Sequence, residues 1–308
     1  MVRYKKILAV LALLSVMGMA VQGQENGDNI AISQGIRTPF PALAPAAYQG
    51  HFWRVDAEND ADLPRNFRTC QSSFYGVEHK YASEVDASYI PSRKGLDGLR
   101  ISGSGQFSAR QFDALVHELR KKTKGPIYDV DLRQESHGFF NDTAVSWYGR
   151  HDWGNIGKSQ ADVLADEQQR LQSALGKDVT VYDQGKGDLP IHPQTMAVRR
   201  VQTEPELAES KGVHYVRLAS TDHLWPTPGE IDAFMAFIRT LPAHAWLHFH
   251  CEAGAGRTTA YMVMYDMIKN PDVPYKDIVY RQYEIGGNYT PSRRIPSPTR
   301  RLERTVLS

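Results

Sequence analysis

Cysteine is scarce in this sequence, with only Cys70 and Cys251 among 308 residues. Two cysteines exclude the dense disulfide framework of many small secreted domains. We expect no bridge between them, because the motif around Cys251 calls for a free thiolate. An excess of one charge is also missing, since 36 Lys and Arg residues stand against 35 Asp and Glu residues. The chain therefore has no overall field that would attract nucleic acid.

Long apolar runs are missing as well, with one exception near the start. Residues 7–17 are almost entirely apolar, follow a short basic stretch and precede several small residues. This pattern is typical of a secretory signal peptide, and the run is too short to span a bilayer comfortably. We expect residues 1–23 to be removed, which leaves an exported, periplasmic or secreted protein outside the membrane. An uncleaved membrane anchor is the alternative.

The remaining composition is that of a globular protein, with 41% hydrophobic and 23% charged residues. Helical and strand-like patterns alternate along the chain, which indicates α/β architecture. Capping boxes begin two of the expected helices, at Ser108 and at Thr227. Helices are expected over 108–124, 157–175, 227–241, 258–269 and 275–284, and strands over 127–132, 213–218 and 246–249.

These patterns also suggest a division into domains. Residues 24–60 are expected to be an extended entry segment that belongs to a small β domain, and 61–156 with 213–290 to form the main domain. Residues 157–212 are expected to be an inserted helix plus a small β unit, because short β-like pieces there are broken by glycine and proline. The Arg- and Pro-rich residues 291–308 are typical of a disordered tail.

Residues 250–258, with the sequence HCEAGAGRT, carry the strongest chemical signal. Five residues separate Cys251 from Arg257, with an expected strand before them and a helix after them. Backbone N–H groups of such a loop, together with the helix N-terminus, form a cradle for one phosphate. Arg257 offers a planar fork for two phosphate oxygens, and the same field favours Cys251 as a thiolate nucleophile. A buried cysteine in a glycine-rich turn is the structural alternative.

The other loop residues have expected roles as well. Thr258 is expected to hydrogen-bond the sulfur as it leaves, and His250 to orient the loop rather than transfer a proton. Gly254 and Gly256 are expected to provide backbone angles and close approach that a side chain would block. An acid beside a polyanion is unusual, so we hypothesise that Glu252 pairs with a basic residue of the fold. The residues expected to surround the bound phosphate are Glu252, Ala253, Gly254, Ala255 and Gly256.

A departing alkoxide needs a proton, and Asp222 is the best upstream donor. It lies between an expected strand and an expected helix, on the kind of loop that often holds catalytic groups. A helix cap is the alternative role, but Thr227 already fills that position. Because catalysis then needs ionised Cys251 together with protonated Asp222, we predict an acidic pH optimum.

At this point the sequence resembles a known family. The loop HCEAGAGRTT resembles that of bacterial protein-tyrosine-phosphatase-like phytases, which are inositol polyphosphate phosphatases. The resemblance extends over roughly residues 60–290, and the arginine- and proline-rich C-terminus departs from the family pattern. Further matching stretches are DLRQESHG, SWYGRHDW, TDHLWPTP, WLHFH and YRQYEIGG.

The resemblance implies a protein-tyrosine-phosphatase-like α/β fold, with a central, mostly parallel sheet flanked by helices and a small partial β-barrel domain. It implies stepwise hydrolysis of myo-inositol hexakisphosphate (phytate) and lower inositol polyphosphates, with Asp222 as general acid and with no metal or other cofactor. No nucleic-acid partner is implied, and the oligomeric state stays open.

The same resemblance implies substrate contacts at Arg68, Asp152, Lys186 and His223. Several cations around a polyphosphate are physically reasonable. Solvated surface charge is the alternative for Arg68 and Lys186, and a structural ion pair is the alternative for Asp152.

Two other functions stay open from the sequence. A protein-tyrosine or phosphoinositide phosphatase would share the chemistry and differ in its pocket. An inactive polyphosphate-binding module is the second alternative, although Cys251, Asp222 and Arg257 are all present. A sulfurtransferase also uses a loop cysteine, but it has no need for Asp222.

Overall fold

The computed structural model describes residues 51–75 and 84–289. The expected signal peptide at 1–23, most of the segment 24–60 and the tail at 291–308 lie outside the described residues. Within the described ranges, none of the helices combines the length and the apolar character needed to cross a membrane.

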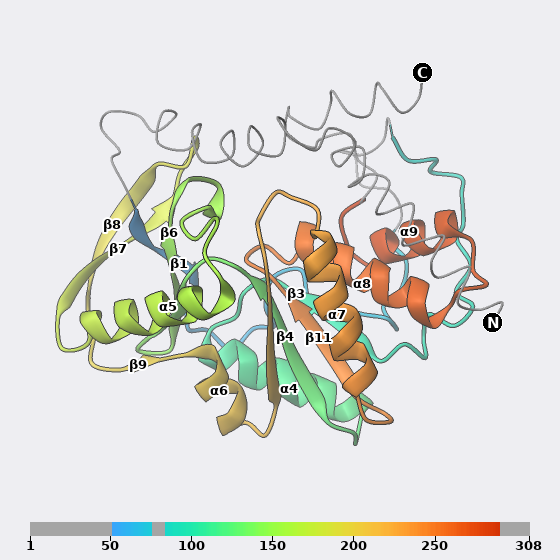
Figure 1. The fold of residues 1–308 in the computed structure, drawn as a ribbon, viewed down its shortest axis with the longest axis horizontal. Coiled ribbons are helices and arrows are strands. Elements are labelled where there is room, and N and C mark those ends of the chain that lie inside the picture. Colours follow the sequence, from blue (N-terminus) through green and yellow to red (C-terminus); the bar gives the residue numbers. More distant parts are fainter. Residues whose placement is uncertain (1–50, 76–83, 290–308) are drawn as a thin grey trace.

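A five-stranded, mostly parallel sheet forms the centre of the larger part of the molecule (Figure 1). Its strands are β2 (Arg68–Thr69), β3 (Ile101–Ser104), β4 (Ile127–Arg133), β10 (His214–Ser220) and β11 (Trp246–His250). They are ordered β10-β4-β11-β3-β2, and only β2 runs antiparallel to its neighbour. Every residue of β11 is buried, as expected for a central strand covered on both faces.

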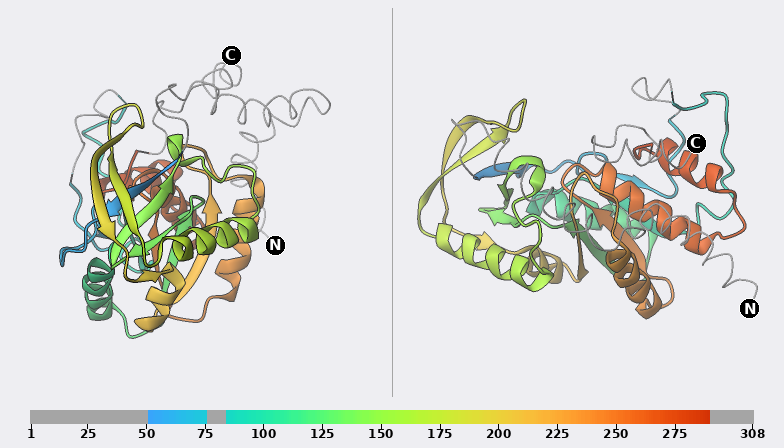
Figure 2. Two further views of the ribbon diagram at one scale, coloured as in Figure 1. Left: turned by 90° about the vertical axis from the view of Figure 1, so that its left-hand side faces the viewer. Right: turned by 45° about the horizontal axis from the view of Figure 1, so that its top comes forward.

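Helices lie on both faces of this sheet (Figure 2). The helices of the described ranges are α4 (Ala109–Lys122), α5 (Gln160–Ala174), α6 (Glu204–Ser210), α7 (Pro228–Thr240), α8 (Gly256–Lys269) and α9 (Tyr275–Glu284), of which α5 belongs to the second sheet described below. Phe234 of α7 packs against Tyr261 of α8 on one face, and α4 lies on the other. The capping boxes predicted at Ser108 and Thr227 are both present and begin α4 and α7.

A second sheet lies beside the first (Figure 1). Its strands are β1 (Phe52–Ala57), β5 (His137–Phe140), β6 (Thr143–Tyr148), β7 (Asp178–Gln184), β8 (Pro190–Ala197) and β9 (Val201–Gln202). The order β8-β7-β1-β6-β5-β9 leaves β8 and β9 as edges that do not pair with each other in the described ranges, so no closed barrel forms there. Leu171 and Ala174 of α5 pack against this sheet with Trp53, Phe140 and Val145.

The second sheet takes more of the chain than the predicted insertion at 157–212. Strands β5 and β6 belong to it, although they fall in the range expected for the main domain. They form a hairpin in which Asn141 and Asp142 both have positive φ, at 49° and 76°. A two-residue turn of this kind matches the twist of the paired strands, so the local sequence builds the hairpin.

Candidate active site

The parallel strands of the central sheet end at one edge, and their ends bring the predicted site residues together. Cys251 follows β11, and Asp222 lies just beyond β10. Glu135 lies just beyond β4, which lies between β10 and β11 in the sheet. Open α/β sheets commonly bind ligands at this edge, because several loops converge there.

Cys251 lies at the bottom of the loop that connects β11 to α8. Its side chain is buried, and the Thr258 hydroxyl donates a hydrogen bond to its Sγ at 3.1 Å. The N-cap residue of α8, Ala255, makes no side-chain capping bond. The first N–H groups of α8 are therefore left for an anion, which matches the geometry predicted for a phosphate cradle.

The two predicted glycines of the loop differ in what the structure demands of them. Gly254 has φ +71°, and a Cβ there would lie 2.2 Å from Gly105 N and 2.3 Å from Ser104 C. At Gly256 the φ is not positive, and a Cβ would meet nothing within 4 Å. The structure therefore requires a glycine at Gly254, whereas at Gly256 no atom of the described residues would exclude a side chain.

Arg257 is held by an acid that the sequence analysis did not single out. Its Nη1 and Nη2 donate to the two Glu135 oxygens at 2.8 and 3.0 Å, and Nη1 also donates to the Ser220 carbonyl at 3.2 Å. Burial by itself would lower the pKa of Arg257, but Asp222 and Glu135 raise it well above its usual value. The guanidinium thus stays charged. One N–H of its Nη2 remains for a phosphate oxygen, while its Nε faces Asp222.

Asp222 is positioned directly beside this guanidinium. Its Oδ1 lies 3.1 Å from Arg257 Nε, and its Oδ2 lies 3.5 Å from the exposed His223 Nε2. Thr227, not Asp222, caps α7, so the alternative role of Asp222 as a helix cap is wrong. The carboxyl is 23% exposed and lies against the arginine of the loop, a position that suits a proton donor.

Arg68 lies behind the loop. Its Nη1 donates to the Gly254 carbonyl at 2.7 Å, and its Nη2 donates to the Thr259 hydroxyl at 3.0 Å. The side chain is buried, so the alternative of a solvated surface charge is wrong. Burial lowers the pKa of Arg68 to about 10, although the nearby Cys251 opposes that effect. In the structure, Arg68 supports the backbone of the loop through its bond to Gly254.

Glu252 has the basic partners hypothesised from the sequence. It forms an ion pair with Arg65, whose Nη2 also donates to the Glu252 carbonyl at 2.6 Å. Arg54 Nη2 lies 3.8 Å away. Glu252 thus links the loop to Arg65 and Arg54, and the hypothesis of a basic partner is confirmed.

Asp152 and Lys186 have different environments. Asp152 is buried, with its Oδ2 3.3 Å from Arg54 Nη2, which is the structural ion pair that the sequence left open. Burial raises the pKa of Asp152 well above its usual value, although Arg54 opposes that effect. Lys186 is exposed between β7 and β8 and makes no hydrogen bond or ion pair with any residue in the described ranges. The contacts shown do not link Lys186 to Cys251.

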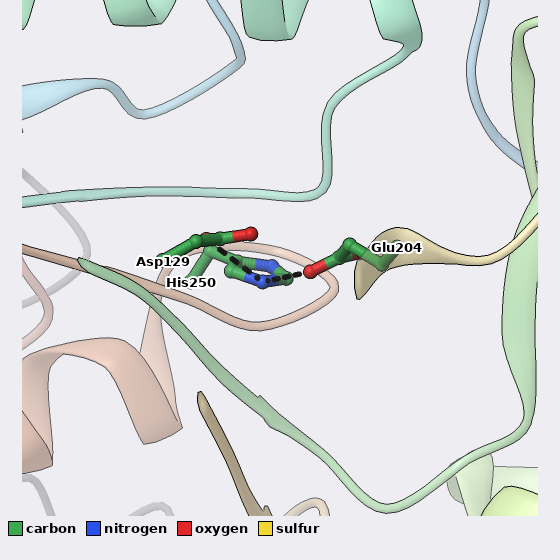
Figure 3. A group of neighbouring side chains, drawn as sticks. All are labelled: Asp129, Glu204 and His250. Carbon is green, nitrogen blue, oxygen red and sulfur yellow. Dashed lines mark ion pairs between the residues drawn. The ribbon is translucent and has the colours of Figure 1, made fainter. Parts of the chain in front are cut away.

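His250 belongs to a buried group of side chains behind the loop (Figure 3). Its Nε2 lies 2.7 Å from Glu204 Oε1 and 3.6 Å from Asp129 Oδ1, and all three side chains are buried. His137 reaches the same Glu204 from the other side, at 3.2 Å. Because His250 has no exposed surface, it cannot pass a proton to a substrate, which agrees with the orienting role expected for it.

The donors Asp129, Glu204 and His250 are a set that could hold a divalent metal ion. Both carboxyl oxygens of Asp129 are buried, and neither accepts a hydrogen bond from a residue in the described ranges. Burial, Glu204 and Asp131 raise the pKa of Asp129 well above its usual value. The raised pKa of Asp129 favours its protonated form, which can donate a hydrogen bond to Glu204.

Sequence reasoning missed Glu135, Glu204 and Trp153. Glu135 lies in the stretch DLRQESHG, directly after a strand of the central sheet, and that position was a usable signal. Glu204 begins α6 and is 46 residues from His250, so its role depends on the folded chain. Trp153 donates from Nε1 to the Asp222 carbonyl at 2.9 Å, a contact between segments 69 residues apart.

Comparison with known proteins gives a family match and several similar structures. A family model for protein-tyrosine-phosphatase-like phytase, described by inositol hexakisphosphate, matches residues 130–269. The tandemly repeated protein tyrosine phosphatase-like phytase of Mitsuokella multacida is 48% identical, with a TM-score of 0.75 over 85% of this chain and 46% of that one. A structure of the same organism's myo-inositol phosphatase, bound to myo-inositol-(1,3,4,5)-tetrakisphosphate, matches equally well.

Two more distant relatives extend this comparison. A phytase of the same type from Bdellovibrio bacteriovorus is 32% identical, with a TM-score of 0.58 over 77% of this chain and 76% of that one. The effector protein hopD2 of Pseudomonas syringae is 35% identical over 183 residues, which are 57% of this chain and 38% of the effector. The chain thus spans less than half the length of the effector and of the Mitsuokella protein. The likeness to the phytase structures confirms the fold class expected from the sequence.

Proposed function

The chain belongs to the protein-tyrosine-phosphatase-like phytase family, and we propose on that basis that it hydrolyses inositol polyphosphates, phytate included, one phosphate at a time. The observation that carries the proposal is the convergence of Cys251, Arg257 and Asp222 around one anion-binding loop. Because the chain covers less than half of the Mitsuokella phytase, its own activity needs a direct test.

The first chemical step follows from this geometry. The Cys251 thiolate attacks phosphorus and forms an S–P bond as the bond between phosphorus and the ester oxygen breaks. Asp222 donates its proton to the departing alkoxide oxygen. Arg257 and the N–H groups of the loop stabilise the charge on the other phosphoryl oxygens. The products of this step are an inositol with one phosphate fewer and a phosphocysteine.

The second step returns the protein to its starting state. Asp222, now a carboxylate, takes a proton from a water molecule as the water oxygen attacks phosphorus. The S–P bond breaks, free phosphate leaves, and the Thr258 hydroxyl stabilises the sulfur as a thiolate. No part of this cycle requires a metal ion, so we propose that activity persists in a chelator.

The substrate class rests on the family and on the inositol tetrakisphosphate complex of the Mitsuokella relative. A phosphotyrosine substrate would use the same loop, so a comparison of phytate with a phosphotyrosine peptide separates the two. Phosphate release from the peptide alone would move the assignment to the protein-tyrosine alternative. Binding of phytate without turnover would favour the inactive module.

The first test is phosphate release from phytate in the presence of a chelator. Wild-type protein should be active at acidic pH and lose activity above neutrality, because the cycle begins with protonated Asp222 and ionised Cys251. Cys251→Ser should bind phytate, release no phosphate and form no phosphocysteine.

Cys70→Ser is the matched control. Cys70 is the other free cysteine, is buried and contacts the Asp97 carbonyl at 3.7 Å, so its loss should leave turnover intact. Equal turnover by Cys251→Ser and wild type, or an optimum above neutrality, would contradict the mechanism.

A further inference from the structure

A turn of the second sheet contacts the loop that carries Asp222. The turn follows β6 and contains a short 3₁₀ helix, Arg150–Asp152, and Trp153. Trp153 Nε1 donates a hydrogen bond to the Asp222 carbonyl at 2.9 Å. His151 packs its ring edge-on against Trp153 at 5.1 Å and against His223 at 5.6 Å. The contact therefore joins the two sheets at the residue proposed as general acid.

Both sides of this contact have unusual backbone conformations. His151 and Asp152 have φ values of 58° and 59°, and His223 has a φ of 61°. Residues other than glycine adopt this left-handed region at a cost in free energy, and the conformation persists only where surrounding contacts maintain it. The ring contacts and the indole hydrogen bond help to maintain these conformations, together with the ion pairs of His151 with Asp188 at 3.4 Å and of Asp152 with Arg54 at 3.3 Å.

The outer part of the Asp222 loop receives little support from burial. His223, Leu224 and Trp225 are all exposed, at 52%, 38% and 41%. On the inner side, the Thr221 hydroxyl donates to Gln134 Oε1 at 3.0 Å. Trp153 donates to the carbonyl of the next residue, Asp222. The chain is therefore held both at Thr221 and at Asp222.

We propose that Trp153 is a positioning residue for the general acid Asp222. Its indole N–H fixes the backbone at Asp222, so that the carboxyl presents its proton to the departing oxygen above the Cys251 sulfur. His151 holds the indole at the correct angle. Trp153 itself exchanges no proton with the substrate. The inference rests on the proposed phosphatase mechanism, because only a reaction with a poor leaving group needs that proton.

Leaving-group dependence provides the test. An inositol oxygen leaves as a strongly basic alkoxide, whereas p-nitrophenolate leaves readily without protonation. Trp153→Phe retains an aromatic ring and removes the N–H. We expect it to lower kcat for phytate by about tenfold or more and kcat for p-nitrophenyl phosphate by less than about threefold, since general acid catalysis contributes ~100-fold or more where it is needed.

Trp225→Phe is the matched control, because Trp225 lies on the same loop and is exposed. It should leave both rates near the wild-type values. His151→Asn is a second variant in case Trp153→Phe folds poorly, since asparagine tolerates the left-handed conformation. It should show the same unequal loss on the two substrates.

A double-mutant cycle separates positioning from a general structural effect. Asp222→Asn should show a large loss on phytate and a small loss on p-nitrophenyl phosphate. Adding Trp153→Phe to Asp222→Asn should then cost little more on phytate, because the group being positioned no longer donates a proton. Equal losses of Trp153→Phe on both substrates, additive losses in the double variant, or a wild-type rate on phytate would each overturn the inference. Failure of the wild-type protein to hydrolyse either substrate would instead overturn the proposed function.

Discussion

Glu135 fixes the orientation of Arg257 through two parallel hydrogen bonds at 2.8 and 3.0 Å. Burial by itself would raise the pKa of Glu135, but Arg257 and Arg133 hold it well below its usual range. Glu135→Gln keeps the shape and removes the negative charge between two buried guanidinium groups. We expect kcat/KM for phytate to fall by about 100-fold and thermal stability to fall, because breaking a buried ion pair leaves an uncompensated charge.

Asp266→Asn is the control for the stability effect. Asp266 forms a buried ion pair with Arg281 in the part of α8 that is remote from Cys251. This variant should lose stability in a similar way and keep the wild-type kcat/KM. If Glu135→Gln merely matched Asp266→Asn, with lower stability and unchanged kinetics, the orienting role of Glu135 would be refuted.

The role of a single residue could be predicted where the residues that act together lie within one short segment. The spacing of Cys251 and Arg257 is local, and so is the position of Asp222 between a strand and a capped helix. Arg68 and Glu135 owe their roles to partners far along the chain, since Arg68 and Gly254 are 186 positions apart. An isolated charge in a sequence looks like a surface charge, because only the fold shows what buries it.

The loop between β11 and α8 depends on one glycine at a point of backbone contact. A methyl group at Gly254 would lie 2.2 Å from Gly105 N and would sit at a φ of +71°. Backbone atoms of the neighbouring loop cannot move aside as a side chain can. Gly254→Ala should therefore lower the thermal unfolding midpoint by several degrees, roughly the effect of 1–3 kcal/mol, and reduce phosphate binding.

Gly256→Ala provides the comparison within the same loop. A methyl group there meets nothing within 4 Å, and the backbone angle suits any residue. Its unfolding midpoint, measured by differential scanning calorimetry, should stay at or slightly above that of the wild type, since alanine is also the better helix former at the start of α8. Equal destabilisation by the two substitutions would show that the close approach at Gly254 is not what constrains the loop.

Elements with strong local signals were predicted well. Helices α4 and α7 start at the capping boxes read from the sequence, and α5 lies within the predicted range 157–175. The hairpin of β5 and β6 was missed, although Asn141-Asp142 between two apolar runs is a recognisable turn signal. Its membership in the second sheet could not be predicted, because it depends on pairing with β1 from a distant part of the chain.

The two sheets are joined by buried charges rather than by apolar contacts alone. Asp56 of β1 accepts from Arg133 of β4 at 2.8 Å and from Arg54 at 2.6 Å. Burial raises the pKa of Asp56, but Arg133 and Arg54 reverse that effect and hold it below its usual value. Composition predicts a neutral, ordinary chain, and it contains no sign that so many of its charges meet inside the molecule.

The buried histidine His137 makes the stability of the whole molecule depend on pH. Burial by itself would lower its pKa, but Asp131 and Glu167 raise it to about 10. A raised pKa means that the charged form is favoured in the folded state. Its contribution is complete below the ordinary value of 6.5 and is lost as the pH rises through about 10. Asp129 acts in the same direction, because its pKa is also raised.

The free energy of unfolding should therefore fall on the alkaline side, and His137→Asn should reveal the cause. The difference between wild type and His137→Asn in urea unfolding should be largest near about pH 6 and shrink towards about pH 10, as linkage requires. The exposed His192 is the control, and His192→Asn should give a small difference that does not vary in this way. If the difference in unfolding free energy between wild type and His137→Asn stayed constant with pH, packing of the neutral ring alone would account for the stabilisation by His137. The expected result would show that the charged His137 makes the folded protein more stable near about pH 6 than near about pH 10.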